Sequence, residues 1–158
     1  MTTTTPLEVG QQAPDLTLFD DAGNEVALRA LMGMRVVLYF YPKDDTPGCT
    51  TQACELRDSW SHFDAVEDLL VYGVSPQDAK SHTKFRAKYD LPFHLLVDDE
   101  QALANAFGFW VEKSMYGKKY WGVERSTVII AADGTIQAIE RKVQPAKHMA
   151  WLVRELGI

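Results

Sequence analysis

The sequence lacks a long hydrophobic run, and it has no excess of positive charge. Its 158 residues include 16 Lys and Arg against 22 Asp and Glu, which gives a formal net charge of -6 at pH 7. An acidic chain has no basic field with which to hold a phosphate backbone, so we expect no nucleic acid partner. A membrane-spanning helix needs about 20 consecutive apolar residues, and we therefore expect no membrane partner either.

A targeting signal is also missing from the start of the chain. The first ten residues read MTTTTPLEVG, which has neither the basic start and apolar core of a secretory signal nor the arginines of a transit peptide. We therefore expect a cytoplasmic protein. A chain of this length can bury one core but not two, so we expect a single domain over residues 1–158, with residues 1–6 as a flexible tail.

Cysteine is scarce, because Cys49 and Cys54 are the only two in the chain. Hydrophobic residues make up 46% of the sequence, which is ample for a packed core without a disulfide framework. In a reducing compartment, two such thiols are either catalytic or inert.

Apolar patterning along the chain alternates between strands and helices. We predict strands or hairpins over residues 15–28, 34–42, 68–76, 93–99 and 125–141, and helices over 48–63, 77–91, 100–107 and 145–156. Residues 110–123, which read WVEKSMYGKKYWGV, are expected to be an irregular aromatic segment. The alternation indicates a three-layer α/β domain with a mixed sheet.

Cys49 stands where a helix is predicted to begin, directly after Thr46, Pro47 and Gly48. Backbone N–H groups and the positive end of the helix dipole point at a side chain in that position. A free thiol has a pKa of roughly 8.5, and lowering a thiol pKa by about two units takes some 2.7 kcal/mol. The dipole supplies about 0.3 to 1 kcal/mol, so a thiolate here needs a positioned cation as well.

Cys54 lies five positions farther along the same predicted helix. Five helical residues leave two side chains about 140° apart, with Cα atoms roughly 8.5 Å from each other. A disulfide needs Cα atoms within about 7 Å, so the intact helix prevents the bond. Thr50, Thr51 and Gln52 are modest helix formers, and the first turns can unwind if the thiols are to pair.

Three other roles for the cysteines stay open at this point. Cys54 alone can be a small core residue, because free cysteine is among the most buried residue types. A thioredoxin-type dithiol motif is disfavoured, because it has two intervening residues rather than four. A zinc site is disfavoured too, since it would have to recruit two histidines that lack ligand spacing with one another and with the thiols, from His62, His82, His94 and His148.

The stretch YPKDDTPGCTTQACELRD resembles the peroxidatic loop of peroxiredoxins, in particular that of the bacterioferritin-comigratory or peroxiredoxin Q subfamily. The family pattern of Pro, three residues, Thr, two residues and Cys is filled by Pro42, Thr46 and Cys49, and Cys54 fills a second cysteine position. The segment GVERSTVIIAADGTI resembles the part of the family that carries an arginine at the start of a strand, here Arg125. The resemblance covers nearly the whole chain.

The resemblance implies a thioredoxin-like fold, with a mixed sheet flanked by helices and an N-terminal β-hairpin. It also implies a thiol-dependent peroxidase that acts on hydrogen peroxide and alkyl hydroperoxides, without a metal or bound cofactor, in antioxidant defence and redox homeostasis. Cys49 would form a sulfenic acid and Cys54 would resolve it as an intramolecular disulfide. Arg125 and Thr46 would hold the peroxide, and Pro42 would pack over the loop.

The same resemblance implies thioredoxin or glutaredoxin as the reductant and a monomeric protein. Many peroxiredoxins have Glu three residues after the peroxidatic cysteine, where this chain has Gln52, so a carboxylate role is not expected there. Five aromatic residues could shape an apolar mouth for alkyl peroxides or simply pack in the core, namely Phe109, Trp110, Tyr116, Tyr120 and Trp121.

Two competing functions share much of this pattern. One is a thioredoxin-like, redox-responsive binding or chaperone module without significant peroxidase turnover, in which unwinding of the helix exposes a partner surface. The other is a glutathione-dependent peroxidase on the same fold. Only a peroxidase depends on Arg125, and only the identity of the reductant separates the two peroxidases.

Overall fold

Strand β3 (Arg35–Phe40) is the centre of the fold. It pairs in parallel with β4 (Leu69–Ser75) on one side and antiparallel with β8 (Ser126–Ile130) on the other. Its run of β-branched and aromatic residues is buried after Arg35, as a strand covered on both faces requires. Because side chains alternate along a strand, Leu38 and Phe40 enter one hydrophobic cluster while Tyr39 enters the other.

The computed structural model describes residues 5–158 and contains a seven-stranded mixed sheet. The strand order is β2-β1-β5-β4-β3-β8-β9, and a separate hairpin is formed by β6 and β7. The remaining strands are β1 (Thr17–Asp20), β2 (Glu25–Ala27), β5 (His94–Val97), β6 (Trp110–Met115), β7 (Lys118–Val123) and β9 (Ile136–Glu140). The α-helices are α1 (Pro47–Asp58), α2 (Trp60–Asp64), α3 (Ala79–Tyr89), α4 (Ala102–Phe107) and α5 (His148–Leu156), and the 3-10 helices are η1 (Leu28–Leu31) and η2 (Pro145–Lys147).

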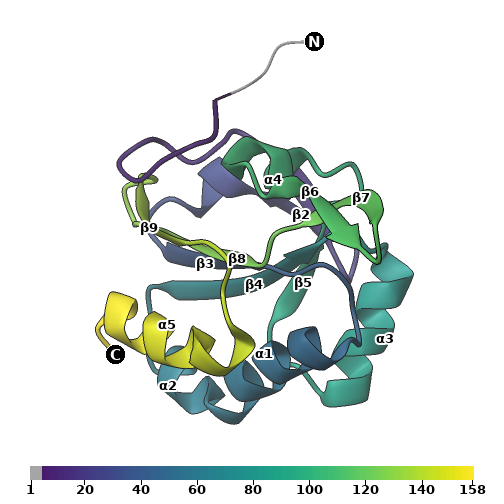
Figure 1. Ribbon diagram of the computed structural model, residues 1–158. Helices are drawn as coiled ribbons and strands as arrows, with labels where there is room; N and C mark the ends of the chain where they lie inside the picture. Colours follow the sequence, from purple (N-terminus) through teal and green to yellow (C-terminus); the bar gives the residue numbers. More distant parts are fainter. Residues whose placement is uncertain (1–4) are drawn as a thin grey trace.

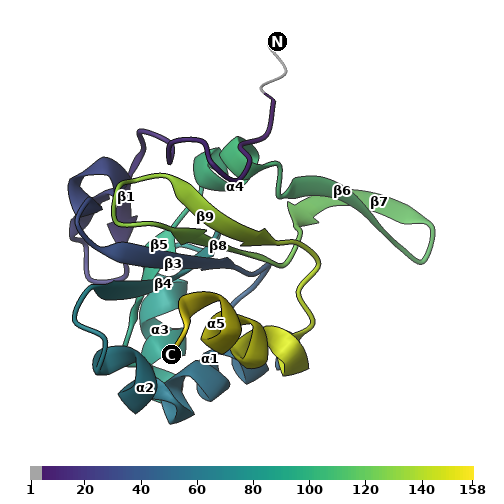
Figure 2. The same cartoon turned by 90° about the vertical axis from the view of Figure 1, so that its left-hand side faces the viewer.

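The sheet separates two layers of helical structure. Helices α1, α2, α3 and α5 lie on one face, and α4 with the β6–β7 hairpin lies on the other (Figure 1). The hairpin projects away from the sheet, which Figure 2 shows after the quarter turn. The predicted α/β architecture, with a mixed sheet flanked by helices and an N-terminal β1–β2 hairpin, is confirmed.

Three expectations about the elements are corrected by the structure. The helix predicted over residues 48–63 is interrupted at Ser59, whose φ of -104° and ψ of 12° separate α1 from α2. The helix predicted from residue 100 begins at Ala102. The segment expected to be irregular is the β6–β7 hairpin, turned at Tyr116 and Gly117 with φ values of 51° and 78°. Two successive residues with positive φ form the tight turn that hairpins favour.

Two sequence expectations concern the chain start and membranes. Residues 1–4 of the predicted tail lie outside the described residues, whereas Leu7 donates its N–H to the carbonyl of Ala106 at 3.0 Å. Among residues 5–158, none of the helices combines the length and the apolar character that crossing a bilayer requires.

Asp98 fixes the start of α4 from a buried position. The residue before the helix, Gln101, has a φ of 56° and makes no side-chain cap hydrogen bond. Instead, the carboxylate of Asp98 accepts hydrogen bonds from the N–H groups of Leu103 and Ala104 at 3.0 and 2.9 Å. Burial raises the pKa of the Asp98 carboxyl, and these two hydrogen bonds oppose that rise. The short helix therefore depends on one carboxylate for its first N–H groups.

We predict that Asp98→Ala lowers the free energy of unfolding by about 3 kcal/mol, because two buried N–H groups lose their acceptor. Asp98→Asn keeps one acceptor oxygen and should lose about half as much. Urea denaturation followed by circular dichroism measures both variants. The exposed neighbour Asp99 is the matched control, and an Asp99→Ala loss as large as that of Asp98→Ala would refute the capping role.

Candidate active site

Cys49 lies in the first turn of α1, which follows β3 at the centre of the sheet. The helix begins with Pro47 after Thr46, whose side chain makes no cap hydrogen bond. The N–H groups of Gly48 and Cys49 belong to the first turn, where a helix supplies no carbonyl acceptor. Cys49 is 1% exposed and packs in the hydrophobic cluster between the sheet and α1, so its sulfur is shielded from bulk water.

Arg125 is the cation that meets Cys49. It lies in the connection between β7 and β8, and its Nη2 donates a hydrogen bond to Cys49 Sγ at 3.3 Å. The contact joins residues 76 positions apart, because β8 pairs directly with β3 at the end where α1 starts. A guanidinium donating to sulfur stabilises a negative charge there, which the helix dipole alone could not do sufficiently.

Gly48 leaves the space that the guanidinium occupies. A Cβ atom at this position would lie 3.0 Å from Arg125 Nη2 and 3.3 Å from Pro145 Cγ. A side chain could therefore enter only by pushing the arginine or the proline aside. The glycine is thus required by the close approach of Arg125 rather than by a turn.

The other end of the guanidinium is held by a buried chain of polar side chains. Arg125 Nη1 donates to Gln52 Oε1, and Gln52 Nε2 lies 3.2 Å from His148 Nδ1. His148 Nε2 lies 2.8 Å from Thr127 Oγ1. Gln52, His148 and Thr127 are all buried, so the chain runs through the packed interface of α1, α5 and β8.

Burial and the nearby charge of Arg125 lower the pKa of His148 to about 3. The imidazole is therefore neutral at physiological pH. Since Gln52 Oε1 is occupied by the guanidinium, its amide N–H faces His148 Nδ1, which must accept. The remaining ring nitrogen, Nε2, carries the hydrogen and donates a hydrogen bond to Thr127 Oγ1.

Thr46 and Pro42 lie in the loop between β3 and α1. Thr46 Oγ1 donates to the carbonyl of Lys43 at 2.9 Å, which closes the loop and leaves the lone pairs of the hydroxyl as acceptors. Pro42 is half-buried, and its carbonyl accepts from Ser75 Oγ at 3.5 Å. The structure therefore brings both residues into the loop that leads to Cys49.

A buried polar cluster anchors this loop to α3. The carboxylate of Asp44 accepts from Tyr41 Oη at 2.6 Å and from Ser81 Oγ at 2.7 Å, and its Oδ2 lies 2.7 Å from His82 Nδ1. The other nitrogen of His82 donates to the carbonyl of Leu96 at 2.9 Å. These contacts fix the loop backbone between Pro42 and Thr46.

Cys54 is half-buried and unbonded, one and a half turns along α1 from Cys49. Both cysteines are free thiols, and the helix over Pro47–Asp58 is continuous through them. The structure therefore keeps the two thiols on different sides of one helix. This agrees with the geometric argument that the folded helix prevents their bond.

The histidines weighed for a zinc site occupy separate environments. His62 is exposed on α2, His82 is bonded to Asp44, and His94 Nδ1 lies 3.0 Å from Asp21. Only His148 is near the candidate site, and both of its ring nitrogens have polar partners. The described histidines do not combine with the cysteines, as the zinc alternative requires; His94 lies instead with Asp20 and Asp21, and the ligand atoms of these three side chains are all within 4.8 Å of one another.

The aromatic residues of this segment differ widely in exposure. Phe109 is fully buried in the core, which agrees with the packing alternative for this residue. Tyr116 is 99% exposed at the tip of the projecting hairpin (Figure 2). Nearer to the site, Lys113 of β6 is half-buried, and burial together with the charge of Arg125 lowers its pKa.

The sequence predicted five site residues but missed others; the five are Cys49, Cys54, Thr46, Arg125 and Pro42. Gln52 was noted only as a departure from a family pattern, although its position three residues after Cys49 puts both on one helix face. Thr127 lies two residues after Arg125 in an extended segment, which places both on one face of it. These two spacings were usable signals. His148 belongs to a helix that is distant in the sequence, and no spacing in the sequence indicates that it lies at the site.

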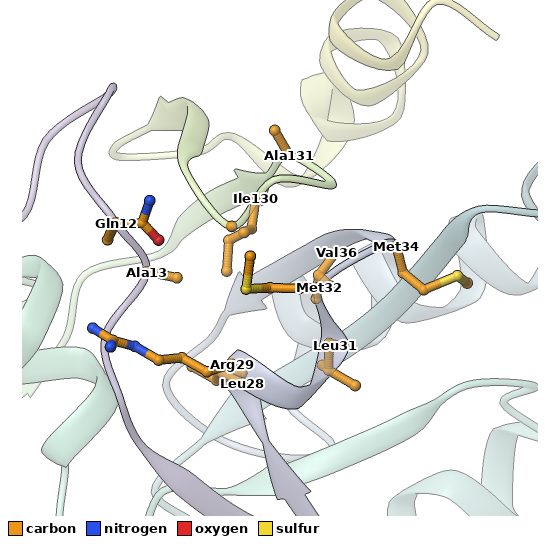
Figure 3. Close-up of a pocket in the computed structure, with 11 residues that line it drawn as sticks. Gln12, Ala13, Leu28, Arg29, Leu31, Met32, Met34, Val36, Ile130 and Ala131 are labelled. Atoms are coloured by element: carbon orange, nitrogen blue, oxygen red, sulfur yellow. The ribbon is translucent and has the colours of Figure 1, made fainter.

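The pocket in Figure 3 lies at the other end of β3. It is lined by Gln12, Ala13, Leu28, Arg29, Leu31, Met32, Met34, Val36, Ile130, Ala131 and Gly134. Its volume of about 10 Å³ is that of a single water molecule at most. It therefore does not compete with the cysteine site as a candidate for chemistry.

The low pKa of His148 predicts acid sensitivity. The unfolded state takes up a proton near the ordinary histidine pKa of about 6.5, whereas the folded state does so only near about 3. Stability contributed by the neutral ring is therefore complete above pH 6.5 and is lost as the pH falls toward 3, by about 3 kcal/mol at pH 4.

His148→Asn, which has no titrating ring, should lack this component, so that its unfolding free energy changes less between pH 7 and pH 4. Urea unfolding at a series of pH values measures the difference. Parallel pH curves for the original protein and the variant would show that the ring is not held neutral.

Comparison with known proteins places this geometry in a family. The AhpC/TSA family model matches residues 9–139. Peroxiredoxin Bcp of Bacillus subtilis is 49% identical over 150 residues, which cover 95% of this chain and 95% of that protein. A putative peroxiredoxin bcp of Coxiella burnetii is 45% identical over 150 residues, which cover 95% of this chain and 99% of that protein.

Solved structures agree with the sequence matches. The bacterioferritin comigratory protein of Xanthomonas campestris, studied for alkyl peroxide reduction, superposes with a TM-score of 0.86 at 37% identity, covering 95% of this chain and 98% of that one. A PrxQ variant of Xylella fastidiosa gives a TM-score of 0.89 at 30% identity, covering 98% of both chains. The expected thioredoxin-like peroxiredoxin fold is confirmed, and the chain belongs to the AhpC/TSA family and, within it, to the peroxiredoxins.

Proposed function

We propose that this chain is a thiol peroxidase that reduces hydrogen peroxide and alkyl hydroperoxides through Cys49. The observation that carries the proposal is the hydrogen bond from Arg125 Nη2 to Cys49 Sγ at 3.3 Å, in a site that excludes bulk water. A buried sulfur beside a fixed guanidinium at a helix N-terminus is suited to react as a thiolate. Membership of the peroxiredoxins supports the same reaction.

In the first step, the Cys49 thiolate attacks one oxygen of the peroxide. The S–O bond forms as the O–O bond breaks, and the departing oxygen takes up a proton and leaves as water or an alcohol. Cys49 is oxidised to a sulfenic acid, and the peroxide is reduced by two electrons. Arg125 and the N–H of Cys49 donate hydrogen bonds to the peroxide and stabilise the charge that moves to the departing oxygen, while the lone pairs of the Thr46 hydroxyl accept from the peroxide O–H and help to hold it in line.

In the second step, the Cys54 thiol attacks the sulfur of the sulfenic acid. An intramolecular disulfide forms and water leaves. Because the folded helix holds the two sulfurs apart, the first turns of α1 must unwind before this step. A dithiol reductant, thioredoxin or glutaredoxin, then returns both cysteines to thiols by disulfide exchange.

The proposal also covers the setting in which the protein works. Residues 1–158 act as one thioredoxin-like peroxiredoxin domain, in the cytoplasm and as a monomer, with no metal or bound cofactor. The acidic net charge of -6 supports a partner set of small peroxides and a protein reductant rather than nucleic acid or a membrane. Pro42 limits water at the loop, where its missing N–H removes a donor.

Two alternatives share the disulfide but differ in what they need. A redox-responsive binding or chaperone module requires the helix to unwind but does not require rapid turnover or Arg125. The contact between Arg125 and Cys49 supports the peroxidase over that module. A glutathione-dependent peroxidase differs in the reductant, and comparing glutathione, glutaredoxin and thioredoxin as donors in one turnover assay separates the two.

We predict that Cys49→Ser abolishes peroxide consumption, because the attacking sulfur is gone. Cys54→Ser should keep the first oxidation, with one peroxide consumed per protein, but lose turnover coupled to thioredoxin. Peroxide loss with a thioredoxin recycling assay, together with mass spectrometry after one equivalent of peroxide, measures both. Peroxide consumption by Cys49→Ser at the original rate would overturn the mechanism.

Gly48→Ala should slow the oxidation of Cys49 by roughly fivefold, because the new methyl group displaces the guanidinium and weakens its hydrogen bond. The melting temperature of this variant should not fall together with the oxidation rate, since alanine is a better helix former than glycine. Stopped-flow tryptophan fluorescence gives the rate. Thr50→Ala on the same helix is the control, and an equal slowing by both variants would exclude the steric explanation.

A further inference from the structure

His148 and Thr127 are buried polar residues that the reaction steps above do not use. His148 is 2% exposed at the start of α5, and Thr127 is fully buried in β8. They are linked to the site through Gln52, at 3.2 Å from His148, and from there to Arg125. A continuous hydrogen-bonded chain therefore runs from the core of the sheet to the guanidinium beside Cys49.

We propose that His148 is a positioning residue of the peroxidase, which orients Arg125 by fixing the amide of Gln52. This proposal rests on the proposed function, because it assigns a role within the same site. The hydrogen-bond partners of His148 are Gln52 and Thr127, and it acts on Cys49 only through Gln52 and Arg125.

Arg125 at one end of the chain determines which group donates and which accepts in each of its hydrogen bonds. A guanidinium can only donate, so the side-chain oxygen of Gln52 must face Arg125 and its NH₂ must face His148. His148 Nδ1 then accepts from Gln52, and Nε2–H donates to Thr127 Oγ1 at 2.8 Å. One ring tautomer satisfies all three bonds.

Gln52 needs His148 as a partner because a side-chain amide can flip by 180° with little change in its packing. If rotated, its NH₂ would face Arg125, and two donors would oppose each other in a buried site. Because His148 Nδ1 is an acceptor, the Gln52 amide has all its hydrogen bonds satisfied only when its oxygen faces Arg125. The guanidinium is thereby held with Nη1 on Gln52 and Nη2 on Cys49.

The ring itself is held firmly and stays uncharged. Tyr39 of β3 lies against it, with ring centroids 5.7 Å apart. The titratable groups on its inner side are Tyr39 and Arg125, and Glu140, Lys142, Lys147 and Arg154 line a surface pocket together with His148. Burial and the charge of Arg125 keep the pKa of His148 near 3. A protonated ring would donate from both nitrogens and could not accept from Gln52.

The chain also connects the site to the state of α1. Thr127 and His148 belong to β8 and α5, whereas Gln52 belongs to the helix whose first turns must unwind for the disulfide. When those turns unwind, Gln52 leaves His148 and the guanidinium loses one of its two side-chain acceptors. Arg125 is thus fully oriented only while α1 is helical, which is when Cys49 reacts with peroxide.

The decisive test is a double-mutant comparison of the rate at which peroxide oxidises Cys49. His148→Phe removes the acceptor while keeping a planar ring, and His148→Asn retains an acceptor close to the Nδ1 position. We expect His148→Phe to slow the oxidation about tenfold and His148→Asn to restore part of the loss. In an Arg125→Lys background, which lacks the bidentate guanidinium, His148→Phe should change the rate by less than about twofold.

His62→Phe is the matched control, because His62 is exposed on α2 and should leave the rate unchanged. An equal fold-loss from His148→Phe with and without Arg125, or no loss at all, overturns the positioning role. A uniform loss from poor folding would appear in both backgrounds and would count against it in the same way.

The tautomer gives a second readout that needs no variant. Nitrogen-15 NMR of reduced protein labelled at histidine should show His148 neutral at pH 7, with Nε2 protonated and Nδ1 an acceptor. The opposite tautomer, or a charged ring, overturns the proposal. If Cys49→Ser retains full peroxide consumption, the proposed function itself fails; if that variant is inactive and only the His148 results disagree, the positioning role alone fails.

Discussion

The fold depends, for its chemistry, on one contact between a guanidinium and a buried sulfur. Cys49 is almost entirely buried. A negative charge in such a buried position is costly unless a cation and hydrogen-bond donors accompany it. Arg125 reaches it from 76 residues away because β3 and β8 are neighbours in the sheet. Gly48 leaves room for the guanidinium, and Gln52 holds its other side. The centre of the sheet therefore serves to bring a thiol and a cation together.

The second constraint is the helix that carries both cysteines. A continuous α1 gives Cys49 the unpaired N–H groups of its first turn and keeps Cys54 out of bonding distance. The same helix presents Gln52 to Arg125 and His148. In the proposed mechanism, attack on peroxide and formation of the disulfide thus require different conformations of one segment. The helix geometry therefore separates the two steps, whereas their order is set by the chemistry, because Cys54 attacks a sulfenic acid that exists only after the peroxide step.

Much of this could be predicted from the sequence, because its strongest signals are local. The buried run of β3 and the Pro-Gly start of α1 placed Cys49, and a resemblance to a known motif supplied Arg125. The β6–β7 hairpin was missed because its lysines and aromatic residues are mostly exposed and give no buried face to read. The chain through Gln52 and His148 was missed because it is assembled by tertiary contacts between residues 96 positions apart. Periodicity describes a single element, whereas such a chain exists only between packed elements.

The central claim is that the two cysteines act in separate conformations of α1. Amide hydrogen exchange, followed by mass spectrometry on peptides that cover residues 50–56, tests it most directly. The reduced protein and the Cys54→Ser protein treated with one equivalent of peroxide should both show a protected helix, whereas the protein oxidised to the disulfide should lose that protection. Equal protection of residues 50–56 in the reduced and disulfide states would contradict the account.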